Sequence, residues 1–268
     1  PGKPESESDD PIAMACMDWR MQREQQATMA LQGKAILIGM DPGRKDIVSC
    51  VRTDLPTGAE KATSLSTAQY YNDAKMNQRK KKMRHHLRKA GLTQWNREMP
   101  SFKVFFVAEF EDAVRYIFVP ELERLIHLKC SRPVKKLRWR VYIHKYQTLD
   151  AFCKKLLNGI QDKSQVAVCF GDASFRHSSK GHPTSPRRLW VKKRLERIHG
   201  IACIDIWEFN TSQVCSKCPA PWKLEACTTA QNDHYVRRCN SCSTLWNRDT
   251  NAARNKVFLG RLKQLGIA

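Results

Sequence analysis

Two Cys-x-x-Cys turns near the C-terminus carry the most specific chemical signal in the sequence. They supply four cysteines, and twenty residues separate the two turns: Cys215, Cys218, Cys239 and Cys242. Each turn presents two sulfur atoms on one side of the chain, and two such turns complete a tetrahedral site of four thiolates. Because every ligand comes from the protein, no position remains open for a substrate. The spacing therefore predicts one structural Zn²⁺ ion in a zinc ribbon at 213–246.

Four other residues of this segment have more than one interpretation. Cys227 and His234 lie between the two turns and could compete as ligands, but neither has the spacing of a turn. Arg237 and Arg238 stand beside the second turn, where a ribbon often approaches a phosphate backbone. A solvated basic edge explains the two arginines equally well.

Four acidic residues stand where strands or helices are expected to begin or end: Asp41, Asp172, Glu208 and Asp249. Hydrolysis of a phosphodiester with two Mg²⁺ ions requires carboxylates from different elements that hold the ions about 3.5–4 Å apart. Asp41 on the first strand, Glu208 on a later strand and Asp249 on the last helix have the positions that such a site needs. Each acid alone could be an ordinary turn residue, as Asp41 before Pro42 could be. The prediction of a nuclease site therefore depends on their joint placement.

These residues need a scaffold that brings distant segments together. Apolar runs ending in turns predict buried strands at 35–41, 165–172 and 201–208, and the pattern at 46–53 predicts a strand in a hairpin with the first. Helical patterns cover 69–89, 102–128 with a break near Pro120, 137–157, 187–199 and 247–265. A strand hairpin followed by helices, strand, helix, strand and helix is the order of an RNase H-like α/β domain.

The same pattern divides the chain into segments. Residues 1–34 are expected to be disordered or to form a short helix, and 35–212 to form the first part of the RNase H-like domain. A basic helical insertion interrupts this domain at about 69–130. The zinc ribbon at 213–246 is a second insertion, and 247–268 supply the final helix of the domain.

The composition is that of a strongly basic globular protein. Of 268 residues, 41% are hydrophobic, and 47 Lys and Arg outnumber 26 Asp and Glu, which gives a formal net charge of +21. Such an excess favours an anionic partner, most commonly nucleic acid, although charge alone names no activity. The 11 cysteines, several of them within apolar runs, fit a reducing compartment better than a disulfide scaffold. The sequence predicts neither a membrane span nor a signal peptide.

The densest positive charge lies in the predicted helix at 69–89. The residues that we expect to follow a phosphate backbone are Arg79, Lys80, Lys81, Lys82, Arg84, Arg88 and Lys89. The same run could act as a nuclear localisation signal. A merely solvated helix face remains the alternative for these seven residues.

Three motifs follow one another in the C-terminal part: Glu208-Phe-Asn-Thr-Ser212, the two cysteine turns, and Asn247-Arg-Asp-Thr-Asn-Ala-Ala-Arg-Asn255. In this order they resemble the C-terminal half of the transposon-encoded RNA-guided nucleases, which are TnpB of prokaryotes and the Fanzor proteins of eukaryotes and viruses. Gly39-Met-Asp-Pro-Gly-Arg44 is similar to the first motif of their RuvC-type nuclease domain. Its Asp-Pro-Gly-Arg, and Phe170-Gly-Asp172 followed by Lys180-Gly181, resemble the Fanzor branch.

The resemblance, which extends from about 35 to 255, implies a RuvC-type nuclease that cuts DNA with two Mg²⁺ ions and a guide RNA. TnpB carries its second acid on the strand that corresponds here to 166–170, and this strand has no Glu. Most Fanzor proteins carry that acid just before the Thr-Ser motif, where Glu208 stands. The implied triad is Asp41, Glu208 and Asp249, with Asp172 as a candidate fourth acid. A eukaryotic protein of this type would act in the nucleus.

One departure from the family concerns its N-terminal half, which reads the target-adjacent motif and helps to hold the guide RNA–DNA duplex. Only about 34 residues precede the first predicted strand here. We therefore expect a C-terminal fragment, a shortened descendant or a gene model that lacks exons. The alternative to a working nuclease is a catalytically silent or domesticated nucleic-acid-binding protein that is derived from one.

Overall fold

The computed structural model describes residues 22, 24–43, 45–104, 106–171, 188–218, 223–227 and 235–267. Two compact units are present, one formed by Pro1–Thr67 with Phe152–Ala268 and the other by Ala68–Ala151. Five residues to which the sequence drew attention lie outside the described residues: Arg44, Asp172, Lys180, Gly181 and His234. No helix within the described ranges is long and apolar enough to cross a membrane.

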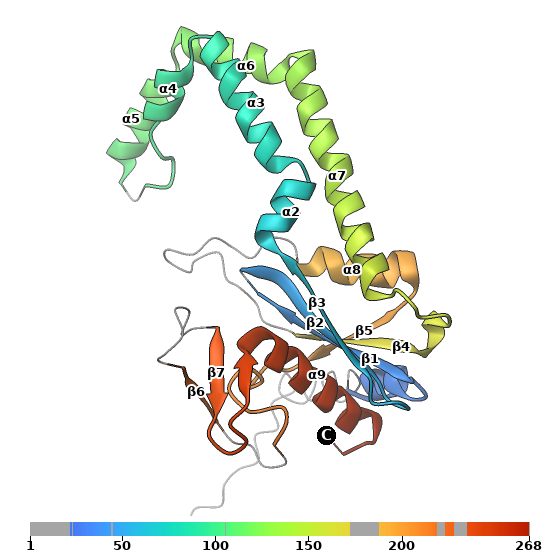
Figure 1. Cartoon of the computed structure of the whole chain (residues 1–268). Coiled ribbons are helices and arrows are strands. Elements are labelled where there is room, and N and C mark those ends of the chain that lie inside the picture. The colour runs from blue at the N-terminus through green and yellow to red at the C-terminus, as the bar shows by residue number, and fades with distance from the viewer. Residues whose placement is uncertain are drawn as a thin grey trace, which may run out of the picture. The chain divides into compact units, whose positions relative to one another are not determined.

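A five-stranded mixed sheet forms the centre of the first unit (Figure 1). Its strands are β1 (Ile36–Pro42), β2 (Asp46–Asp54), β3 (Glu60–Ser66), β4 (Val166–Gly171) and β5 (Ala202–Ile206). They lie in the order β3-β2-β1-β4-β5; the pairs β3–β2 and β2–β1 are antiparallel, and the pairs β1–β4 and β4–β5 are parallel. This is the RNase H-like arrangement, so the predicted α/β fold class and the predicted hairpin of the first two strands are confirmed.

Two helices cover opposite faces of this sheet. Cys169 on β4 faces α9 (Arg248–Gln264), because a side chain added at Gly260 of that helix would collide with its sulfur atom. The ring centroid of the next residue, Phe170, lies 5.7 Å from the ammonium of Lys192 on α8 (Arg188–His199). Since consecutive strand residues point to opposite faces, α9 and α8 lie on different sides of the sheet.

Gly39 allows α9 to approach the sheet closely. A Cβ atom at this position would collide with the backbone carbonyl group of Ala253. Leu37, Gly39 and Asp41 share one face of β1 because strand side chains alternate. Asp41 therefore ends a row of residues that faces α9, and the close contact at Gly39 fixes the height of the helix above it.

A second, three-stranded sheet forms the ribbon. Its antiparallel strands are β6 (Leu224–Ala226), β7 (Val236–Cys239) and β8 (Leu245–Asn247). Asn247 caps α9, because its side-chain oxygen accepts hydrogen bonds from the backbone N–H groups of Asp249 and Thr250 at 3.0 and 3.1 Å. The ribbon therefore runs without a linker into the helix that carries Asp249.

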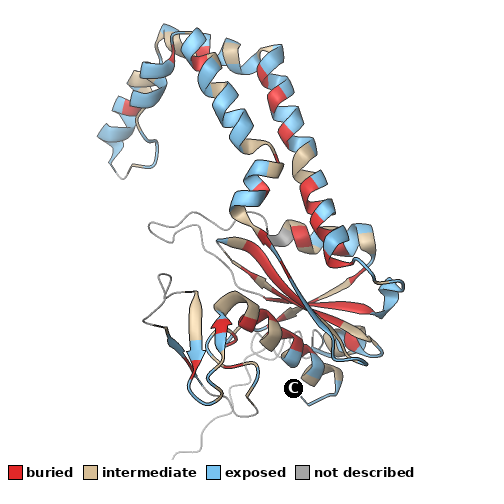
Figure 2. Cartoon of the chain, viewed as in Figure 1, coloured by how far each residue is buried: buried red, intermediate tan, exposed pale blue. Residues whose placement is uncertain are grey.

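The second unit is helical, and its helices are α2 (Thr67–Asp73), α3 (Met76–Lys89), α4 (Thr93–Glu98), α5 (Val107–Ile117), α6 (Pro120–Cys130) and most of α7 (Arg132–Leu156). The end of α7, from Phe152 onward, belongs to the first unit. The predicted break near Pro120 is present, since Pro120 begins α6. The helix predicted at 69–89 is instead divided at Lys75, whose φ of 59° is left-handed. A small core of Leu87, Leu92 and Leu125 holds α3, α4 and α6 together, and most other residues of these helices are exposed (Figure 2).

Candidate functional site

Two of the predicted acids meet at one buried amine. Asp41 lies near the end of β1, and Glu208 follows β5 by two residues. The ammonium of Lys256 on α9 contacts Asp41 Oδ1 and lies 2.6 Å from Glu208 Oε1. Lys256 is completely buried. The structure therefore brings together an acid of β1 and an acid of the loop after β5, around a lysine that the sequence motifs did not identify. Because β5 ends at Ile206, Glu208 does not lie on the strand predicted at 201–208.

One signal in the sequence could have identified Lys256. It stands seven residues after Asp249, which is two helical turns, so both side chains lie on the face of α9 that covers the sheet. A lysine on a helix face otherwise lined by Ala252, Ala253 and Val257 needs a buried anionic partner. That requirement follows from the sequence once the helix is oriented against the first strand.

Asp249 lies in the first turn of α9, and burial raises the pKa of its carboxyl to about 6. The negative charge of Asp41 is the next largest cause, so these two acids are close enough to interact. The carboxylate oxygens of the three acids still do not all lie within the distance that a single metal-binding group requires. Among the described residues, only the four cysteines form a group whose potential ligand atoms all lie within 4.8 Å of one another.

The end of β4 closes one side of this cluster. A Cβ atom at Gly171 would collide with the carboxylate of Glu208 and with the ammonium of Lys256. Only glycine leaves room there for the buried ion pair. The next residue is Asp172, the candidate fourth acid, which lies outside the described residues.

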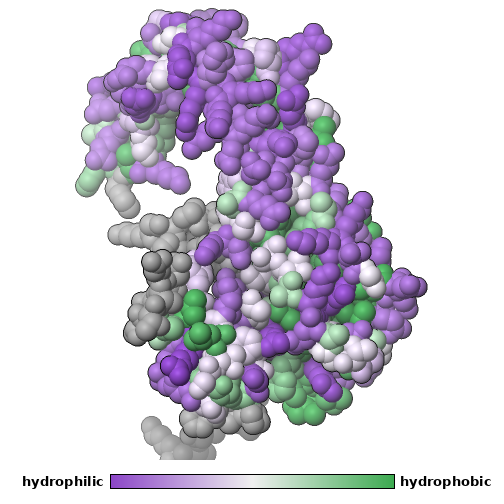
Figure 3. All heavy atoms as spheres, in the orientation of Figure 1, coloured by the Kyte–Doolittle hydropathy of each residue, from purple (hydrophilic) through white to green (hydrophobic). Residues whose placement is uncertain are grey.

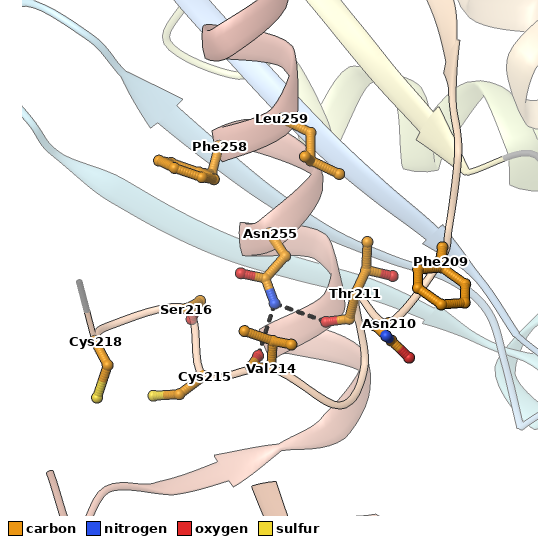
Figure 4. Close-up of a pocket in the computed structure, with 10 residues that line it drawn as sticks. All are labelled: Phe209, Asn210, Thr211, Val214, Cys215, Ser216, Cys218, Asn255, Phe258 and Leu259. Carbon is orange, nitrogen blue, oxygen red and sulfur yellow. Dashed lines mark hydrogen bonds between the residues drawn. The ribbon is translucent and has the colours of Figure 1, made fainter. Parts of the chain in front are cut away.

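Two asparagines of α9 hold the loop that joins Glu208 to the ribbon, and Figure 4 shows one of them, Asn255. The amide of Asn255 donates to the carbonyl oxygens of Thr211 and Val214 at 2.7 and 2.8 Å. Asn251, which is fully buried, donates to the same two carbonyls and accepts from the backbone N–H of Ser216 at 3.0 Å. Both asparagines belong to the motif at 247–255, but the sequence alone assigned them no role. Their five hydrogen bonds tie Glu208, the first cysteine turn and α9 into one structure.

A pocket of about 330 Å³ lies between this loop and α9. Phe209 from the loop and Phe258 and Leu259 from the helix contribute apolar walls (Figure 4). Phe209 stacks on Trp207, with ring centroids 5.5 Å apart, and both rings are largely exposed. Two exposed aromatic side chains therefore flank Glu208 in the sequence.

The four predicted cysteines fit a Zn²⁺ ion. The sulfur atoms of Cys215 and Cys242 lie 3.7 Å apart, and those of Cys218 and Cys239 lie 3.6 Å apart. A tetrahedron with Zn–S distances of about 2.3 Å has sulfur–sulfur edges of about 3.8 Å, so the separations suit that ion. Cys227 is not part of the group. The four-cysteine cluster is consistent with the predicted zinc ribbon.

Hydrogen bonds with neighbouring residues orient two of these sulfur atoms: Cys215 Sγ accepts one, and the Cys242 thiol donates one to Thr244 Oγ1 at 3.2 Å. The indole nitrogen of Trp246 donates to Cys215 Sγ at 3.3 Å. A hydrogen bond with Thr244 lowers the pKa of the Cys242 thiol to about 6. Donors to sulfur stabilise the thiolate form that binds a metal ion.

The seven basic residues predicted to follow a phosphate backbone are all exposed on α3. Its sequence MNQRKKKMRHHLRK contains no acidic residue, and hydrophilic side chains dominate the surface of this helical unit (Figure 3). In the ribbon, Arg238 is exposed and lies opposite Glu225 on β6, whereas Arg237 is half-buried opposite Trp246 on β8. Consecutive strand residues point to opposite faces, so the two arginines do not form one patch.

Comparisons with solved structures find RNA-guided nucleases. CasPhi-2 (Cas12j) bound to crRNA is 12% identical over 91% of this chain and 50% of that chain, with a TM-score of 0.43. A Cas12f1–sgRNA–target DNA complex is 17% identical over 83% of this chain and 49% of that chain, with a TM-score of 0.40. A CRISPR-Cas12f ternary complex is 20% identical over 84% and 39%, with a TM-score of 0.41. The chain thus spans half or less of the length of these structures.

The comparison with family models gives a more local result. Residues 190–256 match the model described as Cas12f1-like, TNB domain, and no curated protein matches the sequence. The matched segment contains Glu208, all four cysteine ligands and Asp249. The match to this family model does not distinguish the Fanzor branch from its relatives. The match places residues 190–256 in the Cas12f1-like TNB domain family, and it supports the relationship to the TnpB and Cas12-like nucleases that the motifs indicate.

Proposed function

We propose that this chain is a metal-dependent DNA endonuclease of the Fanzor/TnpB type, directed by a guide RNA. The observation that carries the proposal is the meeting of Asp41 on β1 and Glu208 in the loop after β5 at one point beside the sheet. Burial of charged groups at the end of a sheet is costly, and such clusters are common where a fold positions catalytic groups. Asp249, from the matched TNB segment, adds a third acid, on the face of α9 that also carries Lys256.

Oxygen donors of this kind suit Mg²⁺, and Asp41, Glu208 and Asp249 are the residues that would hold it. When bound, the metal would supply activation of a water molecule and stabilisation of the leaving oxygen. Lys256 pairs with the carboxylates of Asp41 and Glu208 and offsets part of the negative charge that the site gathers. The set of donors fits one such ion, but the position shared by Asp41 and Glu208 already holds an ammonium.

The nucleic-acid partners follow from charge and from the motifs. A net charge of +21 and the exposed cations of α3 suit the phosphate backbones of DNA and a guide RNA. The basic run at 79–89 is also our proposed signal for nuclear import. The zinc ribbon is proposed as a structural part that holds Glu208 and Asp249 in place.

The proposal is tested by nicking of single-stranded DNA in Mg²⁺. The wild-type chain should cut, and Asp41→Ala should cut at least 10³-fold more slowly because the site loses a metal ligand. Asp54→Ala is a matched control, since Asp54 lies at the other end of the same hairpin and its carboxylate only accepts from Thr57. Equal cleavage by wild type and Asp41→Ala would contradict the assignment.

Lys256 itself favours a second candidate function, a nucleic-acid-binding protein that no longer cuts. A lysine that contacts two of the three acids offsets one of their negative charges, and the remainder could be too small to hold the catalytic metal. In that case the wild-type chain would bind single-stranded DNA in fluorescence anisotropy. It would show no Mg²⁺-dependent cleavage at any metal concentration.

A further inference from the structure

Lys256 contributes a permanent cation to the candidate site. Within the described ranges it is the one charged side chain that is buried, and its exposed fraction is 0%. Removing an ammonium from water costs several kcal/mol unless anions surround it closely. Asp41 and Glu208 are those anions, so the lysine and the two acids form a single electrostatic unit.

The ammonium occupies the point that the two carboxylates share. Asp41 and Glu208 each direct an oxygen atom at Nζ, so a cation bound to these same two oxygen atoms would collide with the ammonium. The backbone at Gly171 packs so tightly against Glu208 and Lys256 that not even a Cβ atom fits. The ammonium therefore has no space on that side into which it could withdraw to admit an ion.

The charges of the site lead to the same conclusion. Three ionised acids carry a charge of −3, and Lys256 reduces the total to −2, which one divalent cation balances. A second divalent cation would leave a net charge of +2 in a partly buried site, where solvent screens charge poorly. The site therefore has the charge for one divalent ion and not for two.

We infer that the Lys256 ammonium takes the place of one of the two metal ions, so that the site binds a single divalent cation beside Asp249. This inference rests on the proposed nuclease function, because it concerns the same three acids. It makes Lys256 a residue that positions and neutralises Asp41 and Glu208, a role that the family motifs do not assign. The positive charge that balances the three acids then comes from one protein cation and one metal ion.

The number of bound Mn²⁺ ions tests this inference. Zinc-loaded wild type, Lys256→Met and Lys263→Met are titrated with Mn²⁺, and free Mn²⁺ is followed by its electron paramagnetic resonance signal. Mn²⁺ that binds elsewhere on the protein is measured with each of the three chains after Asp41→Asn and Asp249→Asn are added to it. This number of ions is subtracted from the total. Lys263→Met is the matched control, because Lys263 lies on the same helix and its ammonium lies 3.5 Å from the carboxylate of Glu24, which is not one of the three acids. The expected numbers are one ion for wild type and Lys263→Met, and two for Lys256→Met.

Thermal unfolding covers the case in which Lys256→Met folds poorly without metal. Without the ammonium between them, the carboxylates of Asp41 and Glu208 should repel each other, so Mn²⁺ should raise the melting temperature of this variant more than it raises that of the wild type. Two ions in wild type, or equal numbers and equal Mn²⁺-induced shifts in both chains, would overturn the inference. One ion in a wild type that does not nick DNA would support the inference and count against the proposed nuclease. Two ions in a wild type that nicks DNA would do the reverse.

Discussion

Asp249 is the acid whose ionisation is opposed most clearly by its surroundings. Burial raises the pKa of its carboxyl to about 6, and the negative charge of Asp41 adds to the effect. Its place in the first turn of α9 acts in the opposite direction, because the positive end of a helix dipole favours a carboxylate. The metal-free protein therefore holds an unfavourable charge at neutral pH, as expected for a group that functions with a cation beside it.

The Asp249→Asn variant should be more stable than the wild type at pH 8 in buffers without Mg²⁺. The folded pKa lies above the unfolded value, so the wild type loses stability as pH rises from about 4 to 6, and the neutral amide avoids this loss. The gain should be on the order of 2 kcal/mol, allowing for partial solvent screening. Urea unfolding between pH 4 and pH 8 measures it. A gain that stayed constant down to pH 4 would contradict the assigned pKa.

At the level of the elements, the loop from Glu208 to the first cysteine turn depends on α9. The two asparagines of the helix satisfy carbonyl groups that the loop cannot satisfy itself, and the ribbon begins directly after them. The position of Glu208 is therefore determined from both sides, by β5 before it and by α9 after it. This gives the Asn251 and Asn255 positions of the motif a physical role.

Replacement of Asn251 by Ala should destabilise the first unit by about 1–3 kcal/mol, because it leaves buried polar groups with fewer hydrogen bonds. It should also slow DNA cleavage, because Glu208 is held less firmly. Chemical denaturation and the nicking assay measure the two effects. Asn158→Ala is the matched control, because the Asn158 side chain is exposed. Arg52 donates its hydrogen bond to the backbone carbonyl of Asn158, which the substitution retains. Equal stability of the two variants would rule out the proposed role.

Loss of zinc should act through the same elements. Cys239→Ser removes a buried ligand and should release the ion, as measured by the zinc content of the purified protein. Cleavage should fall at least tenfold, although no cysteine takes part in the proposed chemistry. Cys130→Ser, which changes an exposed cysteine of the helical unit, should leave zinc content and cleavage unchanged. A zinc-free Cys239→Ser chain with full activity would refute the structural role of the ribbon.

The sequence predicted the buried strands of the central sheet and the main helical segments, but it did not predict an edge strand with few buried residues. The buried strands and the cysteine turns carry strong apolar or ligand patterns. The edge strand β3 was not predicted, because only Thr63 and Leu65 of its residues are buried. The division between α2 and α3 depends on a left-handed Lys75, which no propensity indicates. Lys256 was missed because its buried state depends on contacts between segments that are distant in the sequence.

On the scale of the whole molecule, positive charge determines how the protein meets its partner. The exposed cations of α3 lie on a helix without acidic residues, so no acidic residue of that helix competes with phosphate groups for them. Counterion release makes such contacts strongly dependent on salt. The charge thus predicts both the class of partner and the way in which affinity changes with ionic strength.

Neutralising Lys80, Lys81 and Lys82 together with Ala should weaken binding to double-stranded DNA about tenfold or more at 0.1 M salt. The slope of log affinity against log salt should become shallower by about 2–3, roughly one unit for each phosphate group that the variant no longer neutralises. Fluorescence anisotropy between about 0.05 and 0.3 M salt, a range over which counterion release changes affinity strongly, gives both values. The control removes three exposed lysines of the other unit, Lys154, Lys155 and Lys193. Equal weakening in both triple variants would show that α3 has no special role.

The central claim is that Asp41, Glu208 and Asp249 form one metal-dependent nuclease site. The most direct test is the rate of DNA nicking in saturating Mg²⁺ for Asp41→Asn, Glu208→Gln and Asp249→Asn, each first shown to be folded by its thermal unfolding. We predict that each substitution lowers the rate at least 10³-fold, with the loss of any one acid sufficient. Cleavage that persists at the wild-type rate in all three variants would contradict the claim.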